Sequence, residues 1–245
     1  MEHVLNNVKI VALCVSGGKD SAVSASVAME TLKQLNYRGK VVMLYAHTPL
    51  AVNENLEYVK RLADYLGVEL VVVQPPKGHG LEYIKVAGIP TPWRRWCMYR
   101  WKLEPMLEWA KKQPKPLMFV IGIRVSESQR RFTVYYRHTK EKVWFWNGFY
   151  YYAPILDWDS AKVWKYIEEK GIPRNPLWSV KGHSSHDCVI CIPYSIQRKE
   201  KWLWLKSNYP EIFEKLYTLW RHAQSVKKLR VMIDLDEVKK QATLF

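Results

Sequence analysis

The chain has 245 residues, 48% of them hydrophobic, so it is long enough to bury a core and is not a disordered protein. It has no apolar run long enough for a membrane-spanning helix, and four cysteines are too few for a disulfide-stapled scaffold. The 38 Lys and Arg exceed the 23 Asp and Glu by 15, which suits a polyanionic ligand. The N-terminal residues show no secretory signal, so we expect a cytoplasmic protein that is not bound to a membrane.

Buried strands alternate with helices in the first half of the chain. Continuous apolar runs predict strands over 8–15, 40–46, 68–73 and 117–122, and helical spacing predicts helices over 21–36, 53–66 and 101–113. Gly67 follows the second helix and is expected to end it. This alternation predicts a doubly wound α/β/α sandwich, with about five mainly parallel strands between two layers of helices.

The pattern changes after the fourth strand. The remaining predicted elements are a β-hairpin over 132–146, a helix over 159–170, a loop over 174–195, and helices over 196–207 and 210–224. Asp157 or Asp159 is expected to cap the 159–170 helix, and Gly171 to end it. We therefore divide the chain into a nucleotide-binding part, residues 1–156, and a helical, cysteine-bearing extension, residues 157–245, packed as one compact unit.

The glycine-rich segment Ser16-Gly17-Gly18-Lys19-Asp20-Ser21 stands between the first predicted strand and the first helix. Two glycines allow a tight turn whose N–H groups point at one spot, and the helix N-terminus adds partial positive charge. This predicts a pyrophosphate cradle in which Lys19 adds a charge and Asp20 holds Mg²⁺. The loop is not a Walker A motif, because Leu13 and Asp20 replace required residues. The alternative is an ordinary Gly-Gly turn capped by Ser21.

Arginine-rich sequence follows. Residues 91–142 contain 13 Lys and Arg against 4 Asp and Glu, with Trp93, Trp96 and Trp101 interleaved. Arg and Trp together can clamp phosphates and stack on bases, so we expect these residues to line a groove for nucleic acid or a charged nucleotide. The alternative is a solvated basic surface. Within this segment Arg124, Arg130 and Arg131 follow the fourth strand, where they can hold phosphate or sulfate; the alternative is ion pairing with Glu127.

Three cysteines form a second candidate site. Cys188 and Cys191 make a Cys-x-x-Cys pair that lets two thiolates reach one metal centre, and Cys97 is a third. The alternatives are a structural Zn²⁺ with His183 or His186 as fourth ligand, or plain thiols that act as a redox pair. Cys14 lies in the first buried run and is expected to be an inert core thiol.

The loop at residues 16–21 resembles the PP-loop of the ATP pyrophosphatase superfamily. Four further stretches resemble its phosphoadenosine phosphosulfate (PAPS) reductase-like branch: residues 53–59; Gly122-Ile123-Arg124 with Glu127, Ser128 and Arg131; Pro154–Trp158 followed by Asn175-Pro176-Leu177-Trp178; and Cys188-Val189-Ile190-Cys191. The resemblance spans about residues 8–195. It implies that the nucleotide contacts are Ser16, Gly17, Gly18, Lys19, Asp20, Ser21, Gly122, Arg124, Glu127, Ser128 and Arg131, with Lys19, Asp20 and Arg124 catalytic.

Two departures from the family pattern bear on the reaction. Sulfonucleotide reductases attack with a cysteine in a C-terminal tail, whereas no cysteine follows Cys191 here. Those reductases also tend to have an eroded loop, and this loop is intact. Both features favour cleavage of ATP to AMP and pyrophosphate. The family's usual Asp-Thr-Gly after the second strand is His47-Thr48-Pro49, which leaves the contacts to the nucleotide sugar undefined.

The resemblance also implies a cofactor and a reaction. Cys97, Cys188 and Cys191 would hold a [4Fe–4S] cluster with one open iron, and the enzyme would adenylylate an acceptor for sulfur transfer to nucleic acid, tRNA or DNA, bound through residues 91–142. The alternatives are a reductase of adenylyl sulfate or its 3′-phosphorylated form, and a regulatory nucleotide-binding module without turnover. The acceptor, the sulfur donor and a homodimeric state are left open by the sequence.

Overall fold

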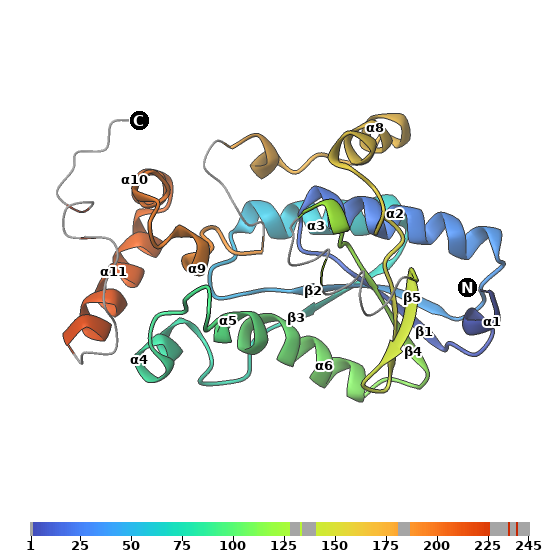
Figure 1. The fold of residues 1–245 in the computed structure, drawn as a ribbon, viewed down its shortest axis with the longest axis horizontal. Coiled ribbons are helices and arrows are strands. Elements are labelled where there is room, and N and C mark those ends of the chain that lie inside the picture. Colours follow the sequence, from blue (N-terminus) through green and yellow to red (C-terminus); the bar gives the residue numbers. More distant parts are fainter. Residues whose placement is uncertain are drawn as a thin grey trace. The chain divides into compact units, whose positions relative to one another are not determined.

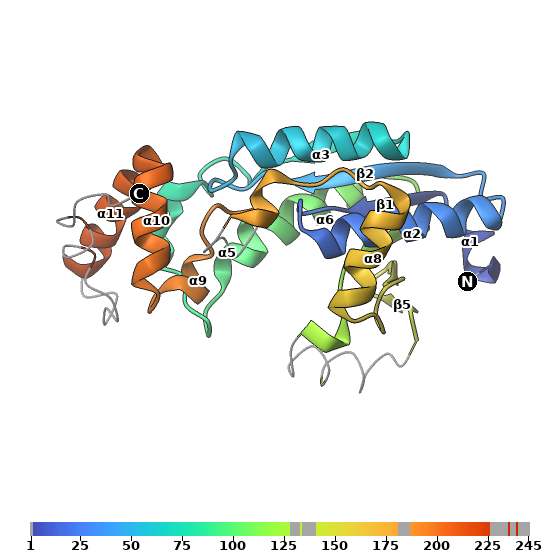
Figure 2. The same ribbon diagram turned by 90° about the horizontal axis from the view of Figure 1, so that it is seen from above.

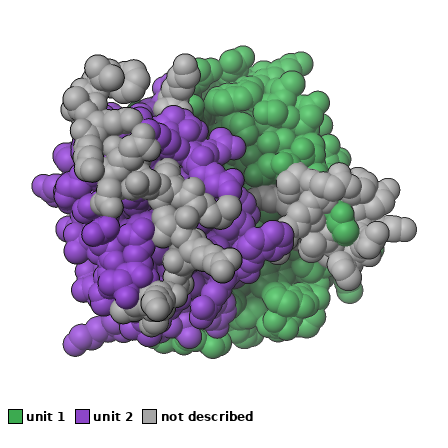
Figure 3. Space-filling view, turned by 60° about the vertical axis from the view of Figure 1, so that its left-hand side comes forward, with its two compact units in different colours: residues 1–46, 53–73, 106–178 green, residues 47–52, 74–105, 179–245 purple. Residues whose placement is uncertain are grey.

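The computed structural model describes residues 2–127, 133, 141–180, 187–225, 235 and 239. Its chain forms two compact units, coloured separately in Figure 3. Unit 1 comprises Met1–Ala46, Asn53–Val73 and Met106–Trp178, and unit 2 comprises His47–Val52, Gln74–Pro105 and Ser179–Phe245. The sequence-based division at residue 156 stays a prediction. Among the described residues, no helix is both long and apolar enough to cross a membrane.

Unit 1 is built on a six-stranded sheet in the order β3-β2-β1-β4-β6-β5. Its strands are β1 (Ile10–Cys14), β2 (Lys40–Ala46), β3 (Glu69–Val73), β4 (Leu117–Ile121), β5 (Val143–Trp146) and β6 (Phe149–Tyr152). All neighbouring pairs are parallel except β5 with β6. The sheet order reverses at β1, which has β2 on one side and β4 on the other, and this places the end of β1 where open parallel sheets bind ligands.

Helices cover both faces of this sheet (Figures 1 and 2). One core lies under α2 (Lys19–Gln34), α3 (Asn53–Leu66) and α8 (Ser160–Lys170), and the other lies against α6 (Glu104–Lys111). Side chains of β1 point alternately to the two faces of the sheet, so Leu13 packs in the first core and Ala12 in the second. The predicted α/β/α sandwich is therefore confirmed. A short helix, α1 (Glu2–Leu5), precedes it.

Local signals place most elements of unit 1 correctly. Helix α3 has the predicted bounds, and Gly67 follows it with a φ of +66°. Of the two proposed caps for α8, Asp159 is the N-cap, and its side chain accepts a hydrogen bond from the Lys162 N–H at 2.7 Å. Gly171 adopts a φ of +63° at the other end of α8. These boundaries depend on neighbouring residues only, which is why the sequence predicts them.

The β-hairpin lies later in the chain than predicted. Strand β5 supplies the second half of the predicted 132–146 hairpin, and it pairs antiparallel with β6. Asn147 and Gly148 form the turn with φ values of +47° and +80°, and an Asn-Gly pair favours this turn because both positions need positive φ. Most of residues 132–137, the predicted first strand, lie outside the described residues.

Unit 2 contains short helices and the C-terminal helix pair. Its elements include η1 (Leu81–Tyr83), α4 (Ile84–Ala87), α5 (Trp96–Met98), a π-helical turn over Tyr99–Leu103, α9 (Ile192–Ser195), α10 (Lys199–Asn208) and α11 (Pro210–Ser225). The predicted 101–113 helix thus begins earlier, at Trp96. Trp202 and Trp220 pack edge to face with ring centroids 5.6 Å apart and join α10 to α11.

Candidate nucleotide-binding site

The loop of residues 16–21 connects the end of β1 to the start of α2. Gly17 has a φ of +86°, a left-handed conformation that favours glycine. The Ser21 hydroxyl closes the turn, because it accepts from the Ser16 N–H at 3.2 Å and donates to the Gly18 carbonyl at 2.8 Å. The sixteen-residue helix α2 begins at Lys19 and directs its N-terminal amides towards the loop. The result is a compact turn of the kind that binds anions.

Two glycines of the site are required by close packing. A Cβ atom on Gly17 would lie 1.9 Å from the Asn55 Oδ1, and one on Gly122 would lie 2.5 Å from the Ser21 Cα. Gly122 therefore lets the end of β4 approach the first turn of α2. Ser24 reinforces this contact, since its hydroxyl donates to the Ile121 carbonyl at 3.1 Å. The predicted site residue Gly122 thus leaves room for the backbone of Asp20 and Ser21.

The three residues predicted to be catalytic lie together. Arg124 forms a bidentate salt bridge with the Asp20 carboxylate, with Nε–Oδ1 at 3.0 Å and Nη2–Oδ2 at 3.2 Å. The Lys19 Nζ lies 3.0 Å from the same Oδ1. Arg124 is only 5% exposed and also donates to the Ser126 hydroxyl at 3.0 Å. Asp20 rather than Glu127 is thus the ionic partner that the structure gives Arg124.

Other predicted contacts fall at the end of β4. Glu127 closes a 3-10 turn, Val125–Glu127, directly after Arg124. Ser128, Arg130 and Arg131 lie outside the described residues. The sequence assigned no role to Asn55, Asn175 and Trp178, which all donate to loop carbonyl oxygens. The signal that could have found Asn55 is a buried amide on the core-facing side of an amphipathic helix.

A model of the phosphoadenosine phosphosulfate reductase domain matches residues 10–194. The chain belongs to this family. Its site is therefore a PP-loop, and its fold is that of the adenine nucleotide α-hydrolase-like superfamily. The chain is 33% identical over 201 residues to an uncharacterised protein of Methanocaldococcus jannaschii, covering 82% of this chain and 45% of that protein.

The family includes sulfonucleotide reductases among the relatives of this chain. This chain is 25% identical over 160 residues to the adenosine 5′-phosphosulfate reductase of Burkholderia cepacia, and the match covers 62% of this chain and 61% of the relative. The chain spans about half the length of the curated relatives it matches, from 45% to 61% for the first three. Enzymes are thus prominent among its relatives.

Two solved structures share the PP-loop fold. The FMN adenylyltransferase of Candida glabrata, in complex with FAD and inorganic pyrophosphate, superposes with a TM-score of 0.52 at 15% identity, covering 72% of this chain and 54% of that one. The U34-tRNA thiolase of Methanococcus maripaludis, solved with its [4Fe–4S] cluster, gives 0.51 at 15% identity, covering 98% and 82%. At such identities these likenesses show the fold.

The three cysteines of the second candidate site all belong to unit 2. Burial raises the pKa of Cys97 to about 11 and that of Cys188 to about 12, and it also raises the pKa of Cys191. Lys102 forms an ion pair with Asp187 at 2.6 Å. Burial acts to lower the pKa of Lys102, but the charges of Asp187, Cys188 and Cys191 outweigh it and raise that pKa.

The donor chemistry of these three residues suits an iron–sulfur cluster, because cysteine thiolates are the usual ligands of such clusters. Over the described residues, no group of three His, Cys, Asp or Glu side chains is placed to hold a metal ion. His183 and His186, the ligands of the zinc alternative, lie outside the described residues. Cys14 belongs to unit 1, where it is the last residue of β1 and is half-buried; burial raises its pKa to about 12, which lowers the reactivity of a thiol.

The basic segment 91–142 is divided between the two units at residue 105. Trp93 is 97% exposed, whereas Trp101 is 1% exposed and donates its indole N–H to the His79 carbonyl at 2.8 Å. Trp96 packs edge to face on Trp101 with centroids 5.2 Å apart. The prediction that Trp101 lines a groove is therefore wrong, because its ring is needed in the core of unit 2. Trp93 alone of the three tryptophans is almost wholly exposed.

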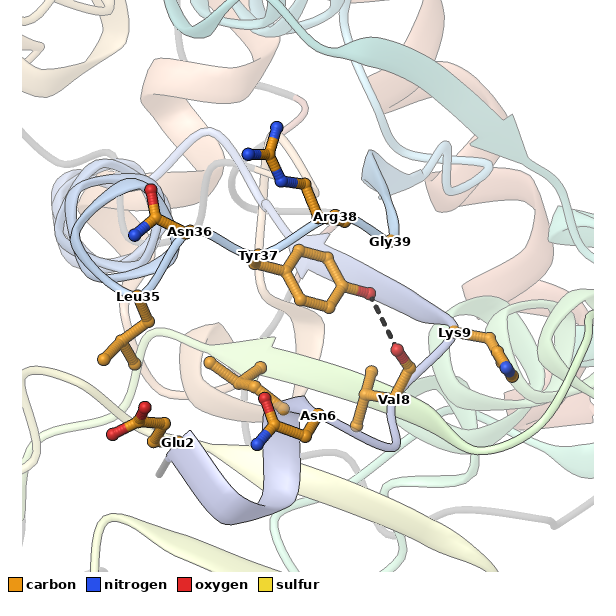
Figure 4. Close-up of a pocket in the computed structure, with 10 residues that line it drawn as sticks. Glu2, Asn6, Val8, Lys9, Leu35, Asn36, Tyr37, Arg38 and Gly39 are labelled. Carbon is orange, nitrogen blue, oxygen red and sulfur yellow. Dashed lines mark hydrogen bonds between the residues drawn. The ribbon is translucent and has the colours of Figure 1, made fainter.

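A cavity of about 410 Å³ lies at the amino-terminal ends of β1 and β2, at the opposite end of β1 from the PP-loop (Figure 4). Lys9, Tyr37 and Arg38 contribute to its lining. The Tyr37 hydroxyl donates to the Val8 carbonyl at 3.3 Å, and burial raises the pKa of Tyr37 to about 12. This hydroxyl braces the connection into β1 and is not part of the PP-loop site.

Proposed function

We propose that this protein cleaves ATP between the α- and β-phosphates and adenylylates an acceptor. The observation that carries the proposal is the closed Ser16–Ser21 turn at the sheet's switch point, with the Lys19 ammonium and the Arg124 guanidinium meeting at Asp20. Backbone amides, a helix N-terminus and two cations form the combination that stabilises a pyrophosphate leaving group.

In the proposed reaction an acceptor oxygen attacks the α-phosphorus, and the bond from that phosphorus to the bridging oxygen breaks. The electron pair leaves with pyrophosphate, whose charge the loop amides and Lys19 stabilise. The proposed role of Asp20 is to hold Mg²⁺ against the phosphates. For that, Asp20 must loosen its pairing with Arg124, which frees the guanidinium for a phosphate oxygen.

We further propose that the acceptor is a nucleic acid. Trp93, which is 97% exposed, offers a ring for base stacking, and its neighbours Arg94 and Arg95 supply charge for the phosphate backbone. The likeness to a tRNA thiolase supports RNA as the class to try first. Cys97, Cys188 and Cys191 are the proposed ligands of a [4Fe–4S] cluster, which would supply sulfur-transfer chemistry. The adenylylation step itself needs no metal at these thiols.

A second candidate is sulfonucleotide reduction, which is favoured by the adenosine 5′-phosphosulfate reductases among the relatives. Parallel assays separate the two. The protein is incubated with ATP, Mg²⁺ and bulk tRNA in one reaction, and with adenylyl sulfate and a dithiol in another. The proposal expects tRNA-dependent pyrophosphate release in the first and no sulfite in the second. Sulfite release without pyrophosphate release would establish the reductase instead.

A further inference from the structure

The carbonyl oxygen of Gly17 accepts two hydrogen bonds from far along the chain. The Asn175 Nδ2 donates to it at 3.0 Å and the Trp178 indole Nε1 donates to it at 2.8 Å. Asn175 is 2% exposed, and its own Oδ1 accepts from the Leu177 N–H at 3.0 Å, which fixes the orientation of the amide. Both lone pairs of this carbonyl are therefore used.

The carbonyls on either side of Gly17 are held as well. The Asn55 Nδ2 donates to the Ser16 carbonyl at 3.1 Å, and the Ser21 hydroxyl donates to the Gly18 carbonyl. Asn55 is fully buried, and its Oδ1 accepts from the Asn175 Nδ2 at 2.8 Å. The two asparagines thus form one connected network within unit 1 that links the loop, the start of α3 and the segment after α8.

Holding the carbonyls fixes the amides. In a planar trans peptide the C=O and the next residue's N–H point in opposite directions. Fixing the carbonyls of residues 16, 17 and 18 therefore fixes the directions of the N–H groups of Gly17, Gly18 and Lys19. Those N–H groups belong to the turn that would receive the phosphates. The Gly18 N–H donates to the Ser16 hydroxyl at 3.3 Å, and a phosphate oxygen would replace this hydroxyl as its acceptor.

We infer that Asn175 and Trp178 are positioning residues of the PP-loop: by binding the Gly17 carbonyl, they hold the loop amides ready for an anion. The inference rests on the proposed function, since it concerns the anion that this loop receives. A purely apolar pair would pack this region without the cost of burying a primary amide. Here the Asn175 amide and the Trp178 indole N–H both donate to one oxygen, the carbonyl oxygen of Gly17.

Trp178→Phe isolates this role. It removes the donor to Gly17 but keeps a ring to pack against Tyr58, whose centroid lies 5.5 Å away. Trp164→Phe is the matched control. Trp164 packs on Trp178 with ring centroids 5.6 Å apart, so this substitution makes the same chemical change one ring further from the loop. Asn175→Ala removes the second donor and the link to Asn55.

Calorimetric titration with inorganic pyrophosphate in magnesium buffer is the first readout. We expect Trp178→Phe to weaken binding about three- to tenfold and Asn175→Ala about ten- to a hundredfold, while Trp164→Phe binds as the wild type. Hydrogen exchange of the peptide that covers residues 16–19, measured by mass spectrometry, is the second readout. It should rise in Trp178→Phe and stay unchanged in Trp164→Phe.

The two readouts distinguish the two claims. A wild-type protein that binds neither pyrophosphate nor ATP would overturn the proposed function, and the exchange of residues 16–19 would then still decide whether Trp178 fixes the loop. Wild-type binding together with unchanged affinity and unchanged loop exchange in Trp178→Phe would overturn the positioning role. Equal changes in Trp178→Phe and Trp164→Phe would do the same, because they would indicate a packing effect.

Discussion

The PP-loop of unit 1 and the three thiols of unit 2 are built on different chemistry. The loop presents backbone N–H groups, which need no ionisation and are oriented by neutral hydrogen bonds to Ser16, Gly17 and Gly18. A thiol must lose its proton to bind a metal, and burial opposes this by raising the pKa of Cys97 and Cys188. The loop therefore suits an anion as it stands, whereas metal binding at the thiols has to offset the cost of ionising buried groups.

The largest expected effect is at the loop. Lys19→Ala or Asp20→Ala should lower pyrophosphate formation about 10²–10³-fold, because each removes a charge that stabilises the leaving group or its metal. Pyrophosphate release at saturating ATP measures this. Lys60→Ala, which removes an exposed cation paired with Glu57 on α3, is the control and should keep full activity. Unchanged release in both loop variants would show that the loop is not the catalytic site.

The second prediction tests the thiol region. Protein purified without oxygen should be brown and contain about four irons per chain. Cys188→Ser should bleach it, whereas Cys14→Ser should not, since Cys14 lies in β1 of unit 1 and is not one of the proposed ligands. Iron, sulfide and zinc analyses are the measurements. A colourless protein with one zinc per chain would instead assign the thiols a structural role.

The third prediction concerns the exposed basic surface. If nucleic acid binds through five or six phosphate contacts, the log–log slope of affinity against salt should be about −4 to −5. Replacing Arg94 and Arg95 together by alanine should reduce that slope by roughly two units. Trp93→Ala should weaken binding of single strands more than of duplexes, because stacking needs unpaired bases.

Gel-shift titrations at two salt concentrations, with tRNA and single-stranded DNA, provide the measurement for this third prediction. Trp101→Phe is the contrasting variant. Because Trp101 is buried, this substitution should change the stability of the protein rather than its affinity for nucleic acid. Absence of binding at low salt would remove nucleic acid as the partner and leave the basic segment as a solvated surface.

The smallest expected effect is within unit 1. Glu30 on α2 pairs with Lys170 on α8 at 2.6 Å, and a hydrogen bond from Lys170 lowers the pKa of Glu30. A lowered folded-state pKa stabilises the fold above the ordinary carboxyl pKa, and this stabilisation is lost as the pH falls through the folded value. Because the Lys170 and Glu30 side chains are 43% and 41% exposed, solvent screens the pair, and Glu30→Gln should cost only about 0.2–1 kcal/mol at neutral pH.

Urea unfolding of the wild type and Glu30→Gln at pH 7 and pH 3 measures this effect. The difference between the two proteins should be present at pH 7 and smaller at pH 3, because Glu30 takes up its proton as the pH falls. A difference that is undiminished at the lower pH would show that packing, rather than the charge of Glu30, joins α2 to α8.

The sequence predicted what neighbouring residues determine. The first four strands, the bounds of α3, a capping aspartate before α8 and the residues of the PP-loop follow from local patterns. The bonds from Asn175 and Trp178 to Gly17 did not follow, because they join residues 158 and 161 positions apart. Only the folded sheet brings those segments together.

Two predictions failed for identifiable physical reasons. Strand β6 was not predicted, because the aromatic and β-branched residues of 132–146 resemble two strands by themselves, whereas the Asn147-Gly148 turn pairs β5 with the residues that follow it. Trp101 was expected in a groove because it lies among arginines, but an indole can serve a core as well as a surface. The composition of a segment does not distinguish a tryptophan in the core from a tryptophan in a surface groove.

The identity of the bond broken in ATP tests the central claim most directly. ³¹P NMR of a reaction containing the protein, ATP, Mg²⁺ and bulk tRNA distinguishes scission at the α-phosphorus from scission at the γ-phosphorus. We predict AMP, free or attached to the acceptor, together with an equal amount of pyrophosphate. Appearance of ADP and inorganic phosphate, or intact ATP in a sample that releases sulfite from adenylyl sulfate, would contradict an ATP pyrophosphatase built on residues 16–21.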